Sequence, residues 1–286
     1  MSKDFLSEIV ARKRAAVAGL VAQKDASAWR DRALENRKRA LPHRLREALE
    51  TDSMPLKIIT EFKRMSPSRG VIRTDFAPAD VAGCYERGGA WSISVVTEEE
   101  YFGGSIADLI AVRATTRLPI LRKDFIIDAI QIYEAAIAGA DAVLLIAAIL
   151  DDSALKKMRI IAEDELQLDA LVEVHTSDEF RRALDSGAKL IGVNNRNLRT
   201  FEVSIRASER IIADAPRDAV MISESGLRSA EQLHHLRALG FRGFLIGEAL
   251  MEAPDPATAL RDLILAASEV HGAQRHGYRS FRLRRV

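Results

Sequence analysis

Eight short apolar segments alternate with helical stretches along most of this chain, and this alternation constrains the fold more than any other feature. The segments begin near residues 56, 90, 118, 142, 169, 189, 219 and 242. Their apolar runs are continuous, which is typical of parallel strands covered on both faces. The helical stretches between them are 78–87, 106–116, 128–138, 151–167, 177–186, 205–213 and 229–239. Eight strand–helix units in about 210 residues favour a single closed (β/α)8 TIM barrel of the α/β class over an open doubly wound sheet. No dinucleotide-binding fingerprint follows the first segment.

The chain length fits a barrel with additional segments at both ends. A barrel of this kind needs roughly 250 residues, and the chain has 286, of which 48% are hydrophobic. We predict an N-terminal helical extension packed on the barrel (1–50), the barrel itself (51–270) and a basic C-terminal tail (271–286). The last residues of this tail lack helical periodicity and are compatible with disorder.

Charge and cysteine content exclude several functional classes. The formal net charge is +1, from 42 basic and 41 acidic residues, so no global field favours nucleic acid or a membrane surface. The apolar run 142–150 is too short to span a bilayer. Residues 1–4 include an acid where a signal peptide would be basic, so we expect a cytoplasmic protein. Cys84 is the only cysteine, which excludes an intrachain disulfide. A fully covered barrel needs no partner subunit, so a monomer is compatible with the sequence.

Charged or amide side chains follow five of the apolar segments, at the ends where parallel barrel strands open on one face. These residues are Glu61, Lys63, Lys123, Glu173, Asn194 and Glu224. A buried strand can carry an ionised group only where water or a ligand offsets the desolvation cost, so the set predicts one shared pocket. Glu61 and Lys63 are two residues apart on an extended strand and therefore point to the same side. Lysine can act as a general acid and glutamate as a general base in such a pocket, although any one of them alone would be interpreted as a rim ion pair.

Two glycine-containing segments indicate a phosphate site. Ser225 and Gly226 follow the seventh strand, and Gly247 and Glu248 follow the eighth. Phosphates in barrels of this type often bind between these two loops. Glu248 is compatible with this role if its side chain turns outward and only its N–H group is used.

Three further features complete the candidate pocket. The donor-rich loop 61–70 can close over an anionic substrate, or it is an ordinary polar connection. The acidic run 98–100 is interpreted as a solvent-exposed loop, and the adjacent segment 101–105 as an aromatic wall for a ring-bearing substrate. His175 has no second histidine spaced to join it, so we predict no metal site.

Six motifs give the chain a resemblance to a known family. They are Glu61-Phe62-Lys63-Arg64 with Ser66-Pro67-Ser68, Leu121-Arg122-Lys123-Asp124-Phe125, Leu171-Val172-Glu173-Val174-His175, Ile191-Gly192-Val193-Asn194-Asn195-Arg196-Asn197-Leu198, Ser223-Glu224-Ser225-Gly226 and Phe244-Leu245-Ile246-Gly247-Glu248. In order and spacing they closely resemble indole-3-glycerol phosphate synthase, from Phe5 to about Ala266. The resemblance implies a (β/α)8 barrel with an N-terminal extension over the active face. It also implies conversion of 1-(2-carboxyphenylamino)-1-deoxyribulose 5-phosphate to indole-3-glycerol phosphate, with loss of carbon dioxide and water, in tryptophan biosynthesis.

The same resemblance implies a role for each matching residue. Lys123 would be the general acid at the ketose oxygen and Glu173 the general base, while Lys63 would contact the substrate carboxylate and donate a proton during dehydration. Residues implied to orient these groups are Glu61, Asn194 and Glu224. Residues implied to bind polar groups and the phosphate are Ser66, Arg196, Ser225, Gly226, Gly247 and Glu248. No cofactor is implied, because decarboxylation restores the aromatic ring without an electron sink. Asn195 stands where some relatives have a serine.

Two alternatives remain open at this stage. An enzyme like phosphoribosylanthranilate isomerase would share the phosphate loops, but it would want an acid–base Cys/Asp pair, and Cys84 falls in a predicted helix. A non-catalytic barrel would bind a phosphorylated ligand, or RNA through the basic, aromatic-containing tail. The complete set of acids and bases argues against the second alternative.

Overall fold

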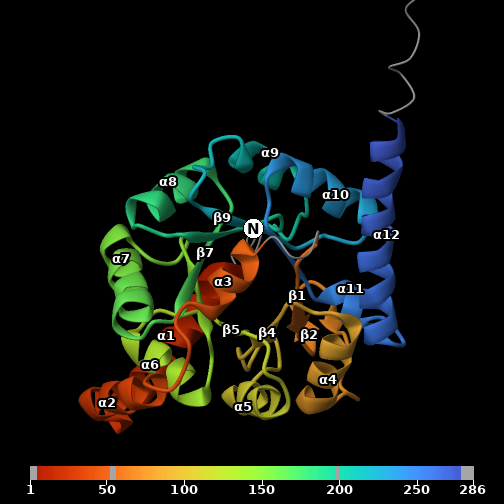
Figure 1. Cartoon of the computed structure of the whole chain (residues 1–286). Helices are drawn as coiled ribbons and strands as arrows, with labels where there is room; N and C mark the ends of the chain where they lie inside the picture. Colours follow the sequence, from red (N-terminus) through yellow and green to blue (C-terminus); the bar gives the residue numbers. More distant parts are fainter. Residues whose placement is uncertain (1–4, 52–55, 198–199, 278–286) are drawn as a thin grey trace, which may run out of the picture.

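A closed barrel of eight parallel strands forms the centre of the computed structural model, which describes residues 5–51, 56–197 and 200–277 (Figure 1). The strands are β1 (Ile58–Phe62), β4 (Ser92–Val96), β5 (Ile120–Lys123), β6 (Ala142–Ile146), β7 (Asp169–Val174), β8 (Leu190–Asn194), β9 (Val220–Glu224) and β10 (Gly243–Ile246). Consecutive strands pair in order, and β1 closes the ring by pairing with both β4 and β10. The predicted barrel is confirmed, and each strand starts within two residues of its predicted segment.

The predicted helices surround this barrel. They are α4 (Pro78–Gly88), α5 (Ile106–Thr115), α6 (Ala129–Ala138), α7 (Asp152–Ile160), the π-helix η1 (Ile161–Glu165), α8 (Ser177–Asp185), α9 (Arg206–Ile212) and α10 (Ala230–Leu239). Capping boxes begin α6, α8 and α10, which explains why the sequence places these starts well. A hairpin, β2 (Met65–Ser66) with β3 (Gly70–Val71), lies within the loop after β1.

Two helices follow β10, namely α11 (Glu248–Met251) and α12 (Pro256–Gly277), and no bounds were predicted from the sequence for either. Asp255 accepts backbone N–H bonds from Ala257 and Thr258 and so caps α12, with Pro256 in its first turn. Helix α12 packs against α4 and α10 on one side of the barrel. Of the predicted tail, the part up to Gly277 continues α12, and residues 278–286 lie outside the described residues, as do residues 1–4 and Leu198.

Side chains on the strands alternate between the helix layer and the barrel interior. Seven apolar side chains form the floor of the interior: Ile59, Leu121, Leu144, Leu171, Leu190, Ile222 and Leu245. Two residues further along several of these strands, the inward position is polar, as at Glu61, Lys123, Glu173 and Glu224. The period of two in a strand therefore converts an apolar floor into a polar mouth within one step.

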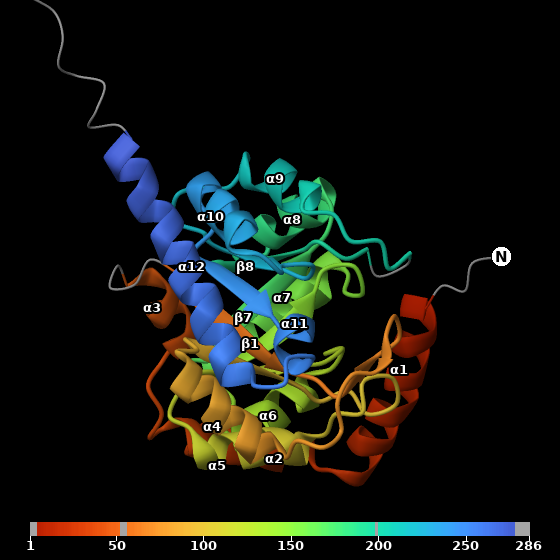
Figure 2. The same cartoon turned by 90° about the vertical axis from the view of Figure 1, so that its right-hand side faces the viewer.

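The N-terminal extension reaches both ends of the barrel. Helix α1 (Phe5–Gln23) lies at the mouth, where Lys13 Nζ is 2.7 Å from Asp124 Oδ1. Helix α2 (Ala26–Arg37) lies along α6. Helix α3 (Arg44–Glu50) covers the opposite end, and its Leu45 and Leu49 are fully buried in the interior cluster. Figure 2 shows α1 and α3 at opposite ends of the barrel. The family resemblance implies that the N-terminal extension lies over the active face. Of its helices, only α1 does so.

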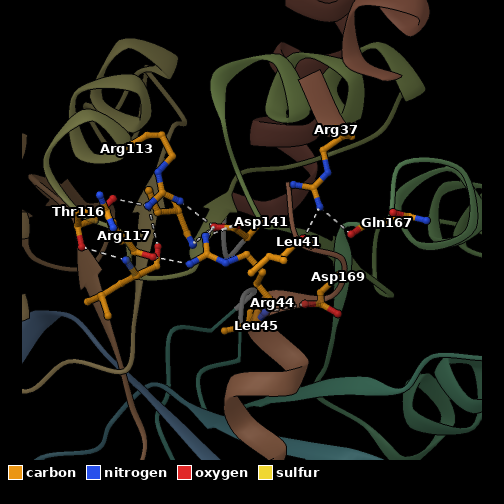
Figure 3. A network of polar contacts seen from close by, with 12 residues as sticks. Arg37, Leu41, Arg44, Leu45, Arg113, Thr116, Arg117, Asp141, Gln167 and Asp169 are labelled. Atoms are coloured by element: carbon orange, nitrogen blue, oxygen red, sulfur yellow. Dashed lines mark hydrogen bonds and ion pairs between the residues drawn. The ribbon is translucent and has the colours of Figure 1, made fainter. Parts of the chain in front are cut away.

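A polar network fixes α3 at this closed end (Figure 3). Arg44 and Arg113 both donate to Asp141, at 3.0 and 2.9 Å, and the backbone N–H of Ile120 adds a third bond at 2.9 Å. Asp169 accepts the backbone N–H groups of Leu45 and Arg46, at 2.8 and 3.0 Å, and so caps the start of the helix. Two carboxylates just before β6 and at the start of β7 thus anchor a helix from more than ninety residues earlier.

None of the described helices combines the length and apolar character that a membrane span requires.

Candidate active site

A cavity of about 310 Å³ opens at the carboxyl ends of the strands, on the side covered by α1. It is lined by eleven of the twelve predicted site residues: Glu61, Lys63, Ser66, Lys123, Glu173, Asn194, Arg196, Ser225, Gly226, Gly247 and Glu248. The twelfth, Glu224, is 1% exposed and lies beside Lys123. The structure therefore brings the predicted set together in one place.

Lys123, at the end of β5, occupies the centre of this set. Its Nζ lies 3.1 Å from Glu173 Oε2 and 3.4 Å from Glu224 Oε2. Asn194 donates to the other oxygen of Glu173 at 3.0 Å, which fixes the orientation of that carboxylate. Strands β5, β7, β8 and β9 thus each contribute one side chain to a single hydrogen-bonded and ion-paired group.

Neighbouring acids keep Lys123 protonated. Burial alone would lower the pKa of its ammonium group, but Glu173, Glu224 and Glu61 outweigh burial and raise that pKa above its ordinary value. At neutral pH the side chain therefore carries a proton that it can donate.

The surroundings of Glu224 favour the protonated form of its carboxyl group. Burial, together with Glu173 and Glu61, raises its pKa to about 8, even though Lys123 lowers it. Neither carboxyl oxygen of Glu224 accepts a hydrogen bond within the described residues. Both observations indicate a carboxyl group that holds its proton to higher pH than an ordinary glutamate does. The side chain fits there only because position 192 on β8 is glycine, since a Cβ atom would overlap Glu224 Oε1.

Glu61 and Lys63 point to the same side, as their spacing predicts, and form an ion pair with 2.6 Å between Oε1 and Nζ. Burial of Glu61 opposes its ionisation, but Lys63, Lys123 and Arg196 outweigh this and lower the pKa of Glu61 below its ordinary value. Gly247 makes room for the pair, because a Cβ atom there would lie 2.5 Å from Glu61 Oε1.

The turn after β9 has a constrained backbone. Ser225 and Gly226 have φ values of 67° and 73°, the left-handed region that a serine rarely adopts. Asn195 supports this turn by donating to Ser223 Oγ at 3.0 Å and to the Ser225 carbonyl at 3.2 Å. Successive backbone N–H groups in a turn can form a concave site for an anion.

Arg196 and Glu248 meet at the rim of the cavity. Arg196 Nη2 lies 3.3 Å from Glu248 Oε2, and Arg196 Nη1 donates to Ser68 Oγ at 3.0 Å. The Glu248 side chain is thus engaged at the rim rather than turned away from it. Ser66 lies beside Ser68 and is 6% exposed.

Another part of the cavity wall is apolar. It includes Val96, Phe102, Phe125, Leu144, Ile146, Phe201, Val203 and Leu245. The predicted aromatic wall includes Phe102, whose ring centroid is 6.2 Å from that of Phe125. Phe125 and Phe201 were not identified as wall residues from the sequence; the signal for Phe125 was its place two residues after Lys123.

The interpretation of 98–100 as a solvent-exposed run is wrong at its first residue. Glu98 is 4% exposed and lines the cavity. Its carboxylate accepts the backbone N–H groups of Tyr101 and Phe102, at 2.8 and 3.1 Å, and so holds the aromatic wall. The overlooked signal was that an acidic side chain can accept the backbone N–H groups of residues two to four positions later and so form a turn, as Glu98 does here.

No group of His, Cys, Asp and Glu side chains within the described residues is arranged to hold a metal ion. Cys84 is half-buried on α4 and does not line the cavity.

Comparison with known proteins gives a consistent result across nearly the whole chain. The family model described as indole-3-glycerol phosphate synthase matches residues 6–263. A protein of that name from Albidiferax ferrireducens is 45% identical over 267 residues, covering 92% of this chain and 99% of the relative. Another from Carboxydothermus hydrogenoformans is 51% identical over 228 residues, covering 78% and 86%.

Solved structures share the fold at low sequence identity. 3-Hexulose-6-phosphate synthase from Salmonella typhimurium has a TM-score of 0.59 and 15% identity, covering 75% of this chain and 99% of its own. Thiamine phosphate pyrophosphorylase from Pyrococcus furiosus has a TM-score of 0.57 and 16% identity, covering 76% and 97%. At such identities these likenesses support the barrel fold alone.

Proposed function

The chain belongs to the indole-3-glycerol phosphate synthase family, and from this premise we propose that its cavity closes the indole ring on 1-(2-carboxyphenylamino)-1-deoxyribulose 5-phosphate. The protein is a carboxy-lyase of tryptophan biosynthesis that acts on a small phosphorylated substrate. A biosynthetic reaction on a phosphorylated small molecule also supports the cytoplasmic location that we propose.

The observation that carries the assignment of roles is the ion-paired group around Lys123. The first step needs an acid on the ketose oxygen while the ring carbon that bears the carboxylate attacks the ketose carbon. Lys123 lines the cavity with its ammonium group 3.1 Å from Glu173, and its raised pKa keeps that group protonated at neutral pH. We assign Lys123 as the general acid of ring closure. Loss of carbon dioxide then restores the aromatic ring.

The second half of the reaction removes the new hydroxyl group as water. Lys63, ion-paired with Glu61 on β1, supplies the proton to the leaving hydroxyl. Glu173 accepts the proton that the substrate loses, and Asn194 holds its carboxylate in place at 3.0 Å. Glu224, whose Oε2 is 3.4 Å from Lys123 Nζ, helps to position the ammonium group. Each proton removed or donated thus has a named group at the mouth of the barrel.

The two ends of the substrate differ in polarity, and so do the two ends of the cavity. The carboxyphenyl ring fits the apolar wall around Phe102 and Phe125, and apolar burial of a ring is favourable at roughly 25 cal/mol per Å². The phosphate fits the backbone N–H groups near Gly226 and Gly247, with Ser225 and Arg196 beside them. A flexible chain held at both ends is folded so that the reacting atoms meet.

The direct test is formation of indole-3-glycerol phosphate, followed by its fluorescence, after purified protein is mixed with the substrate in the presence of a chelator. We expect a rise in fluorescence for the wild type and none above background for Lys123→Met. Absence of a rise with well-folded wild-type protein would overturn the proposal and direct attention to other phosphorylated sugars.

A further inference from the structure

Five charged side chains from four segments meet at one edge of the cavity. We call them the Glu248 cluster: Arg69, Arg196, Arg228, Glu248 and Glu252. Arg69 Nε and Arg228 Nη2 both bind Glu248 Oε1, at 3.0 and 2.5 Å. Arg196 Nη2 lies 3.3 Å from Glu248 Oε2. Arg69 and Arg228 also reach Glu252, at 2.8 and 3.5 Å.

The cluster borders the place proposed for the phosphate. Arg196, Arg228 and Glu248 line the same cavity as Gly226 and Gly247, whereas Arg69 and Glu252 do not. Glu248 is also the residue that follows Gly247 directly. A phosphate near the two glycines therefore lies within the same cavity edge as the Glu248 carboxylate.

The Glu248 carboxylate resembles a phosphate in what it offers to arginine. Its two oxygens accept bonds from three guanidinium groups, and its side chain is 15% exposed, so water screens these bonds only partly. Arginine binds carboxylates and phosphates with the same planar donor geometry. A phosphate group carries up to two negative charges and three terminal oxygens, against one charge and two oxygens for the carboxylate.

We propose that Glu248 competes with the substrate phosphate for Arg228 and Arg196, and that phosphate binding transfers these two arginines from the carboxylate to the phosphate oxygens. This rests on the proposed function. Arg228 then determines specificity for a phosphorylated substrate, and the Glu248 side chain weakens phosphate binding while its backbone N–H group supports it. The arrangement keeps the arginines ordered in the empty site and releases them only to a stronger anion.

Binding of inorganic phosphate to the full-length protein, measured by isothermal titration calorimetry, tests this without any turnover. We expect Glu248→Gln to lower the Kd for phosphate by about three- to tenfold, because the competing charge is removed. We expect Arg228→Gln to raise it about tenfold, the usual effect of losing a hydrogen bond to a charged group.

Two matched variants locate the effect. Arg69→Gln removes another partner of Glu248 that does not line the cavity, and we expect its Kd to stay within about twofold of the wild type. Arg237→Gln alters a separate hollow at the other end of the barrel, which Arg217, Arg237 and Arg242 line, and we expect no change. Circular dichroism and Tm confirm that each variant is folded.

Either of two results would overturn the proposal. One is a Kd for Glu248→Gln that equals or exceeds that of the wild type. The other is weakened binding in Arg237→Gln with none in Arg228→Gln, which would place the phosphate in the far hollow. Failure of the wild type to form indole-3-glycerol phosphate would instead overturn the proposed function, whereas the phosphate affinities of the variants decide this proposal.

Discussion

The substitution Gly192→Ala tests whether Glu224 must lie beneath Lys123 for catalysis. An alanine Cβ atom at this position would overlap Glu224 Oε1 and would lie 3.1 Å from Glu224 Cδ and 3.2 Å from Leu171 Cδ1. Cβ contacts under 3.0 Å essentially do not occur, so the carboxyl oxygen must move by about 1 Å or more. Because Glu224 Oε2 is 3.4 Å from Lys123 Nζ, this movement also shifts the ammonium group.

The expected cost falls mainly on turnover. Misplacement of a catalytic group by about 1 Å lowers rates on the order of 100-fold. Overpacking costs about 1–3 kcal/mol of the free energy of unfolding, which lowers Tm by roughly 2–10 °C for a chain of this size. Turnover is measured by indole fluorescence at saturating substrate and Tm by calorimetry. We expect a large fall in kcat in a protein that is still folded at 25 °C.

Two further variants make this prediction specific. Gly19→Ala lies on α1, where an added Cβ atom meets nothing within 4 Å, and we expect unchanged turnover. Glu224→Asp shortens the side chain and relieves the overlap, so adding it to Gly192→Ala should cost less activity than it costs in the wild type. A kcat for Gly192→Ala within threefold of the wild type would refute the reasoning.

Three other predictions concern charge. Lys123→Met should lower kcat by roughly 1,000-fold or more while substrate binding persists. The reason is that a general acid contributes about 10²–10⁴-fold, and this one is also held by two acids. Single-turnover and binding measurements check the two expectations. The pKa of Glu224 is raised from 4.5 to about 8, so between these pH values the folded state retains a proton that the unfolded state releases. The free energy of unfolding should therefore fall as pH rises from about 4.5 to 8. In urea titrations, Glu224→Gln should make this fall smaller. Asp141→Asn removes the charge that pairs with Arg44 and Arg113, and calorimetry should show a loss of about 3 kcal/mol in the free energy of unfolding. The value of kcat at 25 °C should stay unchanged, because the active site lies at the other end of the barrel.

Each of these predictions has a result that would contradict it. Near-normal turnover in Lys123→Met would show that Lys123 is not the general acid of ring closure. Equal pH dependence in Glu224→Gln and the wild type would show that another group titrates in that interval. A fall in kcat for Asp141→Asn, without a fall in Tm, would mean that the closed end is coupled to the mouth.

The barrel, and the meeting of the strand-end side chains in one cavity, were predictable from the sequence because both depend on local periodicity. Strand and helix lengths follow from residues adjacent in the chain, and parallel strands bring their carboxyl ends to one face whatever the loops do. Lys123, Glu173 and Asn194 could therefore be grouped from their positions in the chain alone. The spacing of Glu61 and Lys63 also predicted that their side chains point the same way, since alternate strand residues share a side.

The parts that the sequence did not reveal depend on contacts between distant segments. Gly192 looks like any other strand glycine until Glu224, from the next strand, is seen to occupy the space that a Cβ atom would fill. Arg69 and Glu248 are 179 residues apart, and no local pattern relates them. Glu98 was misassigned because an acidic run is usually solvated, whereas here the loop folds its N–H groups onto the first carboxylate.

The position of α3 at the closed end of the barrel has a consequence for how the chain folds during its synthesis. The backbone of Leu45 is capped by Asp169, 124 residues later, and its side chain packs with Leu190 and Ile222, later still. At about 5–20 residues per second, a ribosome needs roughly 6–25 s to reach Asp169 after completing α3. For that interval the apolar face of α3 has no barrel to cover it. Helix α3, although made early, is therefore among the last segments to reach its native contacts, because those contacts lie in the second half of the chain.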